Sequence, residues 1–158
     1  MPPTTGRVDV PAARTLLGEV AAAMAGLPPS APADLDGARS RHTELVVGDA
    51  LPGLRARVLA AVAHLPCTPD PSTVRAHRHG TGDFTLPRRA GDAADGGWAL
   101  VLPLEDSDTD GVTAWTGARF DRLLDRAGTA LLLPPHAWTW VSPVRQDRSR
   151  HTVLMGVR

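Results

Sequence analysis

The sequence predicts an α+β fold in which two N-terminal helices pack on one side of a β-sandwich or barrel. The first part of the chain repeats its apolar residues at helical spacing. From Ser72 onward, short segments rich in Val, Leu, Thr and Trp are separated by clusters of Gly, Asp and Pro. Helices followed by a run of short strands are typical of this arrangement. We expect one domain over residues 1–158, with a helical support region at 1–70 and a β-barrel core at 71–158.

Two helices are predicted in the support region. The first begins near Pro11, which suits the first turn of a helix, and it ends before Pro28. The apolar residues at helical spacing are Leu16, Leu17, Val20, Met24 and Leu27. The second helix ends at Pro66, and its apolar stripe consists of Leu51, Leu54, Val58, Val62 and Leu65. A short strand is predicted between the helices, at 43–47.

The remaining elements are short strands bounded by turn-forming residues. Their β-branched and aromatic content and their length favour extended structure over helix. Seven such strands are expected, at 73–79, 83–87, 98–104, 112–116, 129–133, 138–144 and 150–157. Seven strands after two helices are sufficient for a sandwich or a closed barrel.

The charge composition excludes some classes of partner. The chain has 17 basic and 17 acidic residues and no net charge, so a nucleic-acid surface is not expected. Its apolar runs are too short to span a bilayer, and no secretory signal is recognisable at the start, so we expect a cytoplasmic protein without a membrane partner. Cys67 is the only cysteine, which rules out an internal disulfide.

The β half resembles the prolyl-4-hydroxylase-like branch of the iron/2-oxoglutarate oxygenases. In that family a strand ending in Arg-Tyr leads to Gly-Asp-Phe and Pro-His-X-Asp, and the matching stretch runs from Arg78 to Ala90. The later family pattern is a Gly-hydrophobic strand, His-X-Val-X-Pro-Val and an Arg that binds the 2-oxoglutarate carboxylate. It matches the stretches 128–133, 139–144 and 150–154. The resemblance implies a double-stranded β-helix, a jelly-roll or cupin-like barrel.

The resemblance also implies that the iron ligands of the family are absent from their usual positions. The first His falls on Arg88, the Asp on Ala90 and the second His on Thr139, whereas Arg150 keeps its type. An arginine has no lone pair to offer a cation, and alanine has no ligand atom. From this we expect no metal site and no use of iron or 2-oxoglutarate.

The leading hypothesis is therefore a metal-independent enzyme of small-molecule, specialised metabolism. It would catalyse a non-oxidative cyclisation, isomerisation or elimination on a substrate with an anionic or enolic group. We expect His79, Thr139 and His136 to be catalytic. His79, with His136 as an alternate, would move a proton, since imidazole titrates near neutral pH, and Thr139 would donate a hydrogen bond. The expected substrate-binding residues are Arg88, Arg150, Trp98 and His77.

Two alternatives stay open. One is a non-catalytic pseudo-oxygenase that binds a ligand or a partner protein, and a homodimer is compatible with either reading. The other is a true iron/2-oxoglutarate oxygenase whose atypical ligands come from His77, His79, Asp83 and His136, because His-X-His followed by an acid resembles the first cupin motif. His42, in the support region, is expected at the surface.

Overall fold

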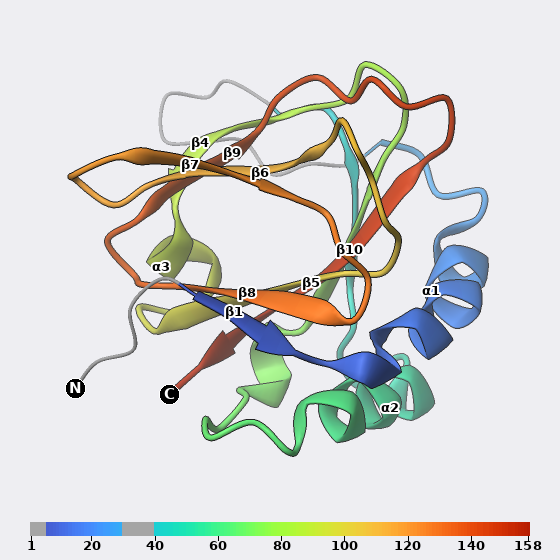
Figure 1. Cartoon of the computed structure of the whole chain (residues 1–158). Helices are drawn as coiled ribbons and strands as arrows, with labels where there is room; N and C mark the ends of the chain where they lie inside the picture. The colour runs from blue at the N-terminus through green and yellow to red at the C-terminus, as the bar shows by residue number, and fades with distance from the viewer. Residues whose placement is uncertain (1–5, 30–39) are drawn as a thin grey trace.

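The computed structural model describes residues 6–29 and 40–158, and its two antiparallel sheets face each other across a barrel (Figure 1). The predicted fold class is confirmed. The helical segments are η1 (Pro11–Leu16), α1 (Leu17–Met24), α2 (Pro52–Val62), η2 (Pro71–Thr73) and α3 (Ala90–Ala93). The strands are β1 (Gly6–Asp9), β2 (Thr43–Val46), β3 (Arg75–His79), β4 (Thr85–Arg89), β5 (Trp98–Pro103), β6 (Gly111–Trp115), β7 (Phe120–Leu124), β8 (Thr129–Leu133), β9 (Trp138–Val141) and β10 (Arg150–Val157).

The strands from β3 to β10 cross between the sheets as the chain proceeds. The major sheet has the order β1-β8-β5-β10-β3-β2, and the minor sheet has the order β4-β9-β6-β7. Thus β3, β5, β8 and β10 lie in one sheet, whereas β4, β6, β7 and β9 lie in the other. This alternation gives the double-stranded β-helix that the sequence resemblance implied.

Two strands were not anticipated from the sequence. β1 pairs with β8 at one edge of the major sheet, and β7 pairs with β6 at one edge of the minor sheet. Together with β2, β1 shows that the region before residue 71 contributes strands as well as helices. Within the described ranges, no helix has the length and apolar character needed to cross a membrane.

The helices cover the outer face of the major sheet (Figure 1). The buried residues of this layer come from η1, α1, α2 and one face of β3, β5 and β10, and they include Val20, Val58, Leu100, Leu102 and Met155. Arg78, on the same face, donates to the carbonyl oxygens of Met24 and Leu27 at 2.5 and 2.7 Å. Met24 is the last residue of α1, and its carbonyl oxygen also accepts a hydrogen bond from the Leu27 N–H at 3.2 Å, so Arg78 ties the end of the helix to β3.

A second, smaller core lies inside the barrel. Its buried members are small or branched residues from both sheets, among them Ala99, Val101, Val112, Ala114 and Leu133. Small side chains allow the two sheets to approach, which leaves the barrel narrow at this level.

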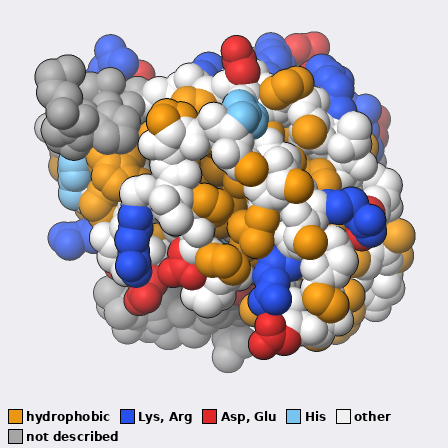
Figure 2. Space-filling view, turned by 90° about the horizontal axis from the view of Figure 1, so that it is seen from below, with side chains coloured by type: hydrophobic (Ala, Val, Ile, Leu, Met, Phe, Trp, Pro, Cys, Tyr) orange, Lys and Arg blue, Asp and Glu red, His pale blue; other side chains and the backbone are white. Residues whose placement is uncertain are grey.

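Outside, acidic and basic side chains are interspersed over the face seen from below, and the described residues there form no continuous patch of one sign (Figure 2).

Candidate functional site

Two neighbouring strands place polar side chains on the lumen side of the major sheet. In the β2–β3 pair Glu44 lies opposite His77, and Thr43 lies opposite Arg78. Side chains alternate along a strand, so His77 and His79 face the lumen whereas Arg78 faces the helices. His42, just before β2, falls on the same side as Glu44. One strand thus supplies His-X-Glu and its neighbour supplies His-X-His.

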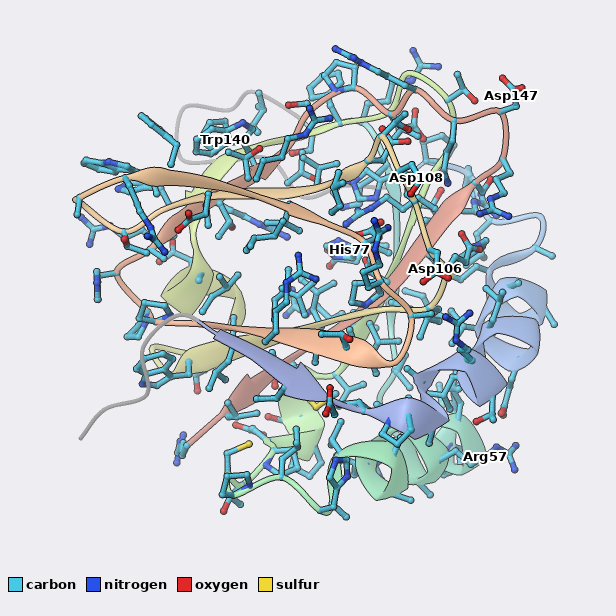
Figure 3. All side chains as sticks on the ribbon, viewed as in Figure 1. Arg57, His77, Asp106, Asp108, Trp140 and Asp147 are labelled. Carbon is cyan, nitrogen blue, oxygen red and sulfur yellow. The ribbon has the colours of Figure 1, made fainter. Side chains whose placement is uncertain are left out.

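Three of these residues form a compact group of metal-ligating atoms. His77 Nε2 lies 2.9 Å from Glu44 Oε2, and His42 Nε2 lies 3.9 Å from the same oxygen. The rings of His42 and His77 are 4.5 Å apart between centroids. One ligand atom from each of the three lies within 4.8 Å of the others. Figure 3 shows the His77 side chain in the space between the two sheets.

His42 is the most unusual member of the group. Its side chain is fully buried, and neither ring nitrogen has a hydrogen-bond partner among the described residues. The ring stacks on His79, with centroids 4.9 Å apart and an interplanar angle of 12°. Buried polar atoms in folded proteins nearly always have a partner, so orphaned nitrogens indicate an absent one. A metal ion beside Glu44 would supply it.

The electrostatics of the group match the needs of a metal. Burial lowers the pKa of His77 to about 4, although the Glu44 carboxylate opposes this shift. Burial alone would raise the pKa of Glu44, but the imidazoles of His42 and His77 and the charge of Arg75 hold it well below its ordinary value. At neutral pH, His77 is therefore neutral and Glu44 ionised, which are the ligand forms of these side chains. Two imidazoles and one carboxylate are the donor set of non-heme ferrous sites, so these residues fit iron.

Beside this group a small, partly open cavity of about 40 Å³ lies between the two sheets. Its polar lining comes from both sheets and comprises His77, His79, Thr85, Arg88, Thr139, Arg150 and Thr152. Apolar residues of the inner core, such as Val101 and Val141, close it. This volume suffices for a few water molecules or one small ionic group and is far smaller than the pocket of a drug-sized ligand.

The structure brings several predicted site residues to this cavity. Arg88 and Thr139 are opposite each other in the β4–β9 pair, and Thr139 Oγ1 lies 3.4 Å from the Arg88 carbonyl oxygen. Two of the three residues on which the family's iron ligands fall in the resemblance therefore lie together at the cavity. Trp140 lies on the other side of the minor sheet (Figure 3), where its ring makes an edge contact with the exposed Phe120.

His79 lies in the cavity wall and is largely committed to protein contacts. Its Nε2 is 2.8 Å from Thr85 Oγ1, and its Nδ1 is 3.5 Å from an Arg150 guanidinium nitrogen. Since the guanidinium can only donate, Nδ1 is the acceptor and Nε2 carries the proton. Burial, with the nearby Arg150 charge, holds the pKa of His79 well below its ordinary value. The ring therefore does not titrate near neutral pH, which was the reason for expecting a proton shuttle.

Arg150 is neutralised by the protein itself. Its Nε and one terminal nitrogen bind the two carboxylate oxygens of Asp125, the second contact being 3.0 Å long. Both side chains are only 2% exposed. Asp125 lies just after β7 and is fixed through its own backbone, because its N–H donates to the Asp110 carbonyl at 3.0 Å. The guanidinium fork of Arg150 is thus already paired.

Two predicted site residues lie away from the cavity. His136 is exposed in the loop between β8 and β9, so a catalytic role with His79 is not supported. Trp98 packs against the helix-side core instead of lining the lumen. The reason is the alternation along β5, where Ala99 and Val101 face inward and Trp98 faces the helices. Asp83 accepts a 2.8 Å hydrogen bond from Gly80 N–H, and it fixes that turn.

His42 and Glu44 are the residues that the sequence prediction missed. The expectation of a surface position for His42 is wrong, because the side chain is fully buried. A usable signal was present, since a strand was predicted at 43–47. Extending it by one residue places His42 and Glu44 on one face, in the same way as His77 and His79. What the sequence could not give was the pairing of β2 with β3.

No protein-family model and no curated protein matches this chain. By contrast, solved structures with the same fold match this chain. An oxidoreductase of the 2OG-Fe(II) oxygenase family from Burkholderia pseudomallei is 13% identical, with 97% of this chain and 84% of that chain covered at a TM-score of 0.66. SnoN, a non-heme alpha-ketoglutarate-dependent epimerase from nogalamycin biosynthesis, is 13% identical, with 98% and 78% covered and a TM-score of 0.67. A prolyl-4-hydroxylase from Pseudomonas putida is 14% identical, with 98% and 92% covered and a TM-score of 0.62.

These comparisons correct one expectation from the sequence. The prediction that neither iron nor 2-oxoglutarate is used rested on the residues at three family positions. It is contradicted, because the structural neighbours include a 2OG-Fe(II) oxygenase and an alpha-ketoglutarate-dependent epimerase, and because His42, Glu44 and His77 form a group that could hold a metal ion. Loss of ligands at one place in a barrel does not exclude ligands at another. The chain has the double-stranded β-helix fold of the iron/2-oxoglutarate oxygenases.

Proposed function

We propose that this protein is an iron- and 2-oxoglutarate-dependent enzyme of small-molecule, specialised metabolism that holds its metal ion at His42, Glu44 and His77. The observation that carries the proposal is the fully buried His42 ring, with two unpartnered nitrogens beside an ionised carboxylate and a neutral imidazole. The dependence of SnoN on alpha-ketoglutarate, and its place in nogalamycin biosynthesis, support the cofactor and the type of metabolism.

Each residue of the group has a distinct task in this proposal. Glu44 supplies negative charge, and Arg75 Nη1, 3.4 Å from its other oxygen, keeps that carboxylate oriented. His77 would hold the ion through Nε2, the atom that now contacts Glu44. His79 stacks on His42 and, through its bond to Thr85, fixes the orientation of the stacked pair. When bound, ferrous iron would supply the redox chemistry for oxidising a substrate with dioxygen.

The lumen residues would position what enters beside the ion. Thr139 and Arg88 are on the opposite sheet and border the same cavity as His77. Val101 and Val141 form an apolar part of the cavity wall, and a ligand seated against it would displace water. Exclusion of water strengthens the interaction of a bound anion with the charges around it.

The test is metal binding by variants of the group. Anaerobic Fe(II), and Mn(II) as a redox-stable probe, would be titrated into purified protein by calorimetry, with the bound metal quantified after dialysis. We expect one ion per chain, and we expect Glu44→Gln and His42→Ala each to weaken binding at least about 10-fold. His136→Gln is the matched control, because it removes an exposed imidazole and should leave the affinity unchanged. Absence of a stoichiometric ion, or full retention by Glu44→Gln, would contradict the proposal.

A further inference from the structure

Two arginines border the cavity, and the protein pairs only one of them. Arg150 makes two hydrogen bonds to the buried carboxylate of Asp125. For the Arg88 side chain, by contrast, no hydrogen bond or ion pair occurs within residues 6–29 and 40–158, although it borders the cavity. The geometry therefore distinguishes a cation that is satisfied by the protein from one that is available to a ligand.

The surroundings of Arg88 favour an anion. Burial lowers the pKa of this guanidinium, and the charge of Arg75 acts in the same direction, while Glu44 and Asp92 oppose it. An arginine stays protonated under such conditions, so its charge is desolvated without a contacting counter-ion. A divalent ion held by Glu44 and His77, on the opposite sheet, would add a second positive charge near the same cavity. A bound anion would offset the positive charge of Arg88 and that of the ion.

Arg88 is also held in a position suited to a ligand. It lies on β4 opposite Thr139, and its neighbour Arg89 points to the other face, where the guanidinium carbon lies 5.6 Å from the centre of the Trp138 ring. The planar fork of an arginine matches a carboxylate with two parallel hydrogen bonds. The cavity of about 40 Å³ has room for one carboxylate group.

We propose that Arg88, and not Arg150, binds the carboxylate of a small organic acid in the lumen, while Asp125 holds Arg150 as an internal ion pair. The proposal rests on the proposed function in placing this acid beside the metal group. Two kinds of acid share this chemistry, a 2-oxo acid that also contacts the metal and a carboxylated substrate that does not. They differ in whether the metal and the 2-oxo group strengthen binding.

The experiment uses 2-oxoglutarate and glutarate, which share two carboxylates and differ in the 2-oxo group. Each would be titrated by calorimetry into the whole chain, with and without Mn(II). We expect Arg88→Gln to weaken the binding of both acids at least about 10-fold with or without the ion, because the bidentate partner is lost. Arg88→Lys should recover part of the affinity, since it keeps the charge. Arg89→Gln, on the same strand and facing outward, is the control and should stay within about 2-fold of the unaltered chain.

The outcomes separate this proposal from the proposed function. If the acids bind in an Arg88-dependent manner but no metal binds, the carboxylate site stands and the metal site fails. If Mn(II) binds and the acids do not, or if Arg88→Gln binds them as tightly as the unaltered chain, the carboxylate site is overturned. Arg88→Gln should retain its Mn(II) affinity, which would show that the variant is folded. Tighter binding of 2-oxoglutarate than of glutarate only with Mn(II) would identify the 2-oxo acid as the ligand.

Discussion

The major sheet buries both of its faces, and the two faces are built from different chemistry. On the helix side, β3 and β10 present Ala76, Val153 and Met155, all essentially inaccessible to water. On the lumen side, the same two strands present His77, His79 and Arg150, which are buried almost as completely. One face is stabilised by removing apolar surface from water, whereas the other depends on pairing each polar group that it buries.

This difference shows where the molecule gives up stability for a site. Arg150 is paired with Asp125, and His79 with Thr85, so most of the lumen face is satisfied. Among the described residues, His42 is the one side chain with two buried nitrogens that lack partners, whereas Arg75 and Glu105 each have one such atom. The described apolar residues of the helix-side core have no side-chain polar group that would need such a partner.

Breaking a pair on the lumen face should have the largest effect. In Asp125→Ala the buried guanidinium of Arg150 loses its carboxylate, and we expect the free energy of unfolding to fall by about 3–5 kcal/mol. The measurement is urea denaturation of the metal-free protein, followed by circular dichroism. The double variant Asp125→Leu/Arg150→Met should recover most of the loss, because it removes both charges. A single variant that loses under 1 kcal/mol would show that the pair is not effectively buried.

A matched exchange on neighbouring residues of β10 should have a smaller effect and should sharpen the comparison. Val153→Thr introduces a hydroxyl into the apolar helix-side core, and we expect a loss of about 1–3 kcal/mol. Thr152→Val removes a hydroxyl that borders the cavity, and we expect a change below about 1 kcal/mol. Both are measured by urea denaturation. Equal losses would mean that the two faces tolerate polarity alike.

The elements predicted from the sequence were those with a strong local signal. The two helices and the strand segments at 98–104, 129–133 and 150–157 have clear apolar patterns, and each appears within a few residues of its predicted bounds. β7 was missed because Phe120-Asp-Arg-Leu-Leu does not alternate cleanly, and its Phe120 is largely exposed. β1 is four residues long and extended only through its pairing with β8.

The candidate site was predictable only in part, because it depends on pairing between distant segments. His77 and His79 were recognised from their own spacing, whereas the partner Glu44 is supplied from 33 residues away. The Arg150–Asp125 pair likewise depends on a loop after β7, a strand that was not expected. Trp98 was expected to bind substrate but packs on the helix side, because its inward or outward direction depends on the register of β5 with β10.

The smallest predicted effect on stability concerns His42. Its replacement by an apolar residue would make this position of the lumen face resemble the helix side of the major sheet. His42→Leu replaces an unpartnered buried imidazole by an apolar side chain of the kind used on the helix side. Because an unsatisfied buried polar group costs free energy, we expect the metal-free variant to be as stable as the unaltered chain or more stable by about 1 kcal/mol. Urea denaturation without metal is the measurement.

The same variant should respond differently when metal is present. A ligand that binds only the folded chain at about 100 times its Kd adds about 2.7 kcal/mol to the free energy of unfolding. We expect Mn(II) to stabilise the unaltered chain in this way and to leave His42→Leu unaffected, while His136→Leu behaves as the unaltered chain does. If His42→Leu instead lost more than 2 kcal/mol without metal, the ring would be a packing element of the core. The unpartnered His42 nitrogens would then not indicate a metal site. The lumen face would differ from the helix side only in the residues that it buries.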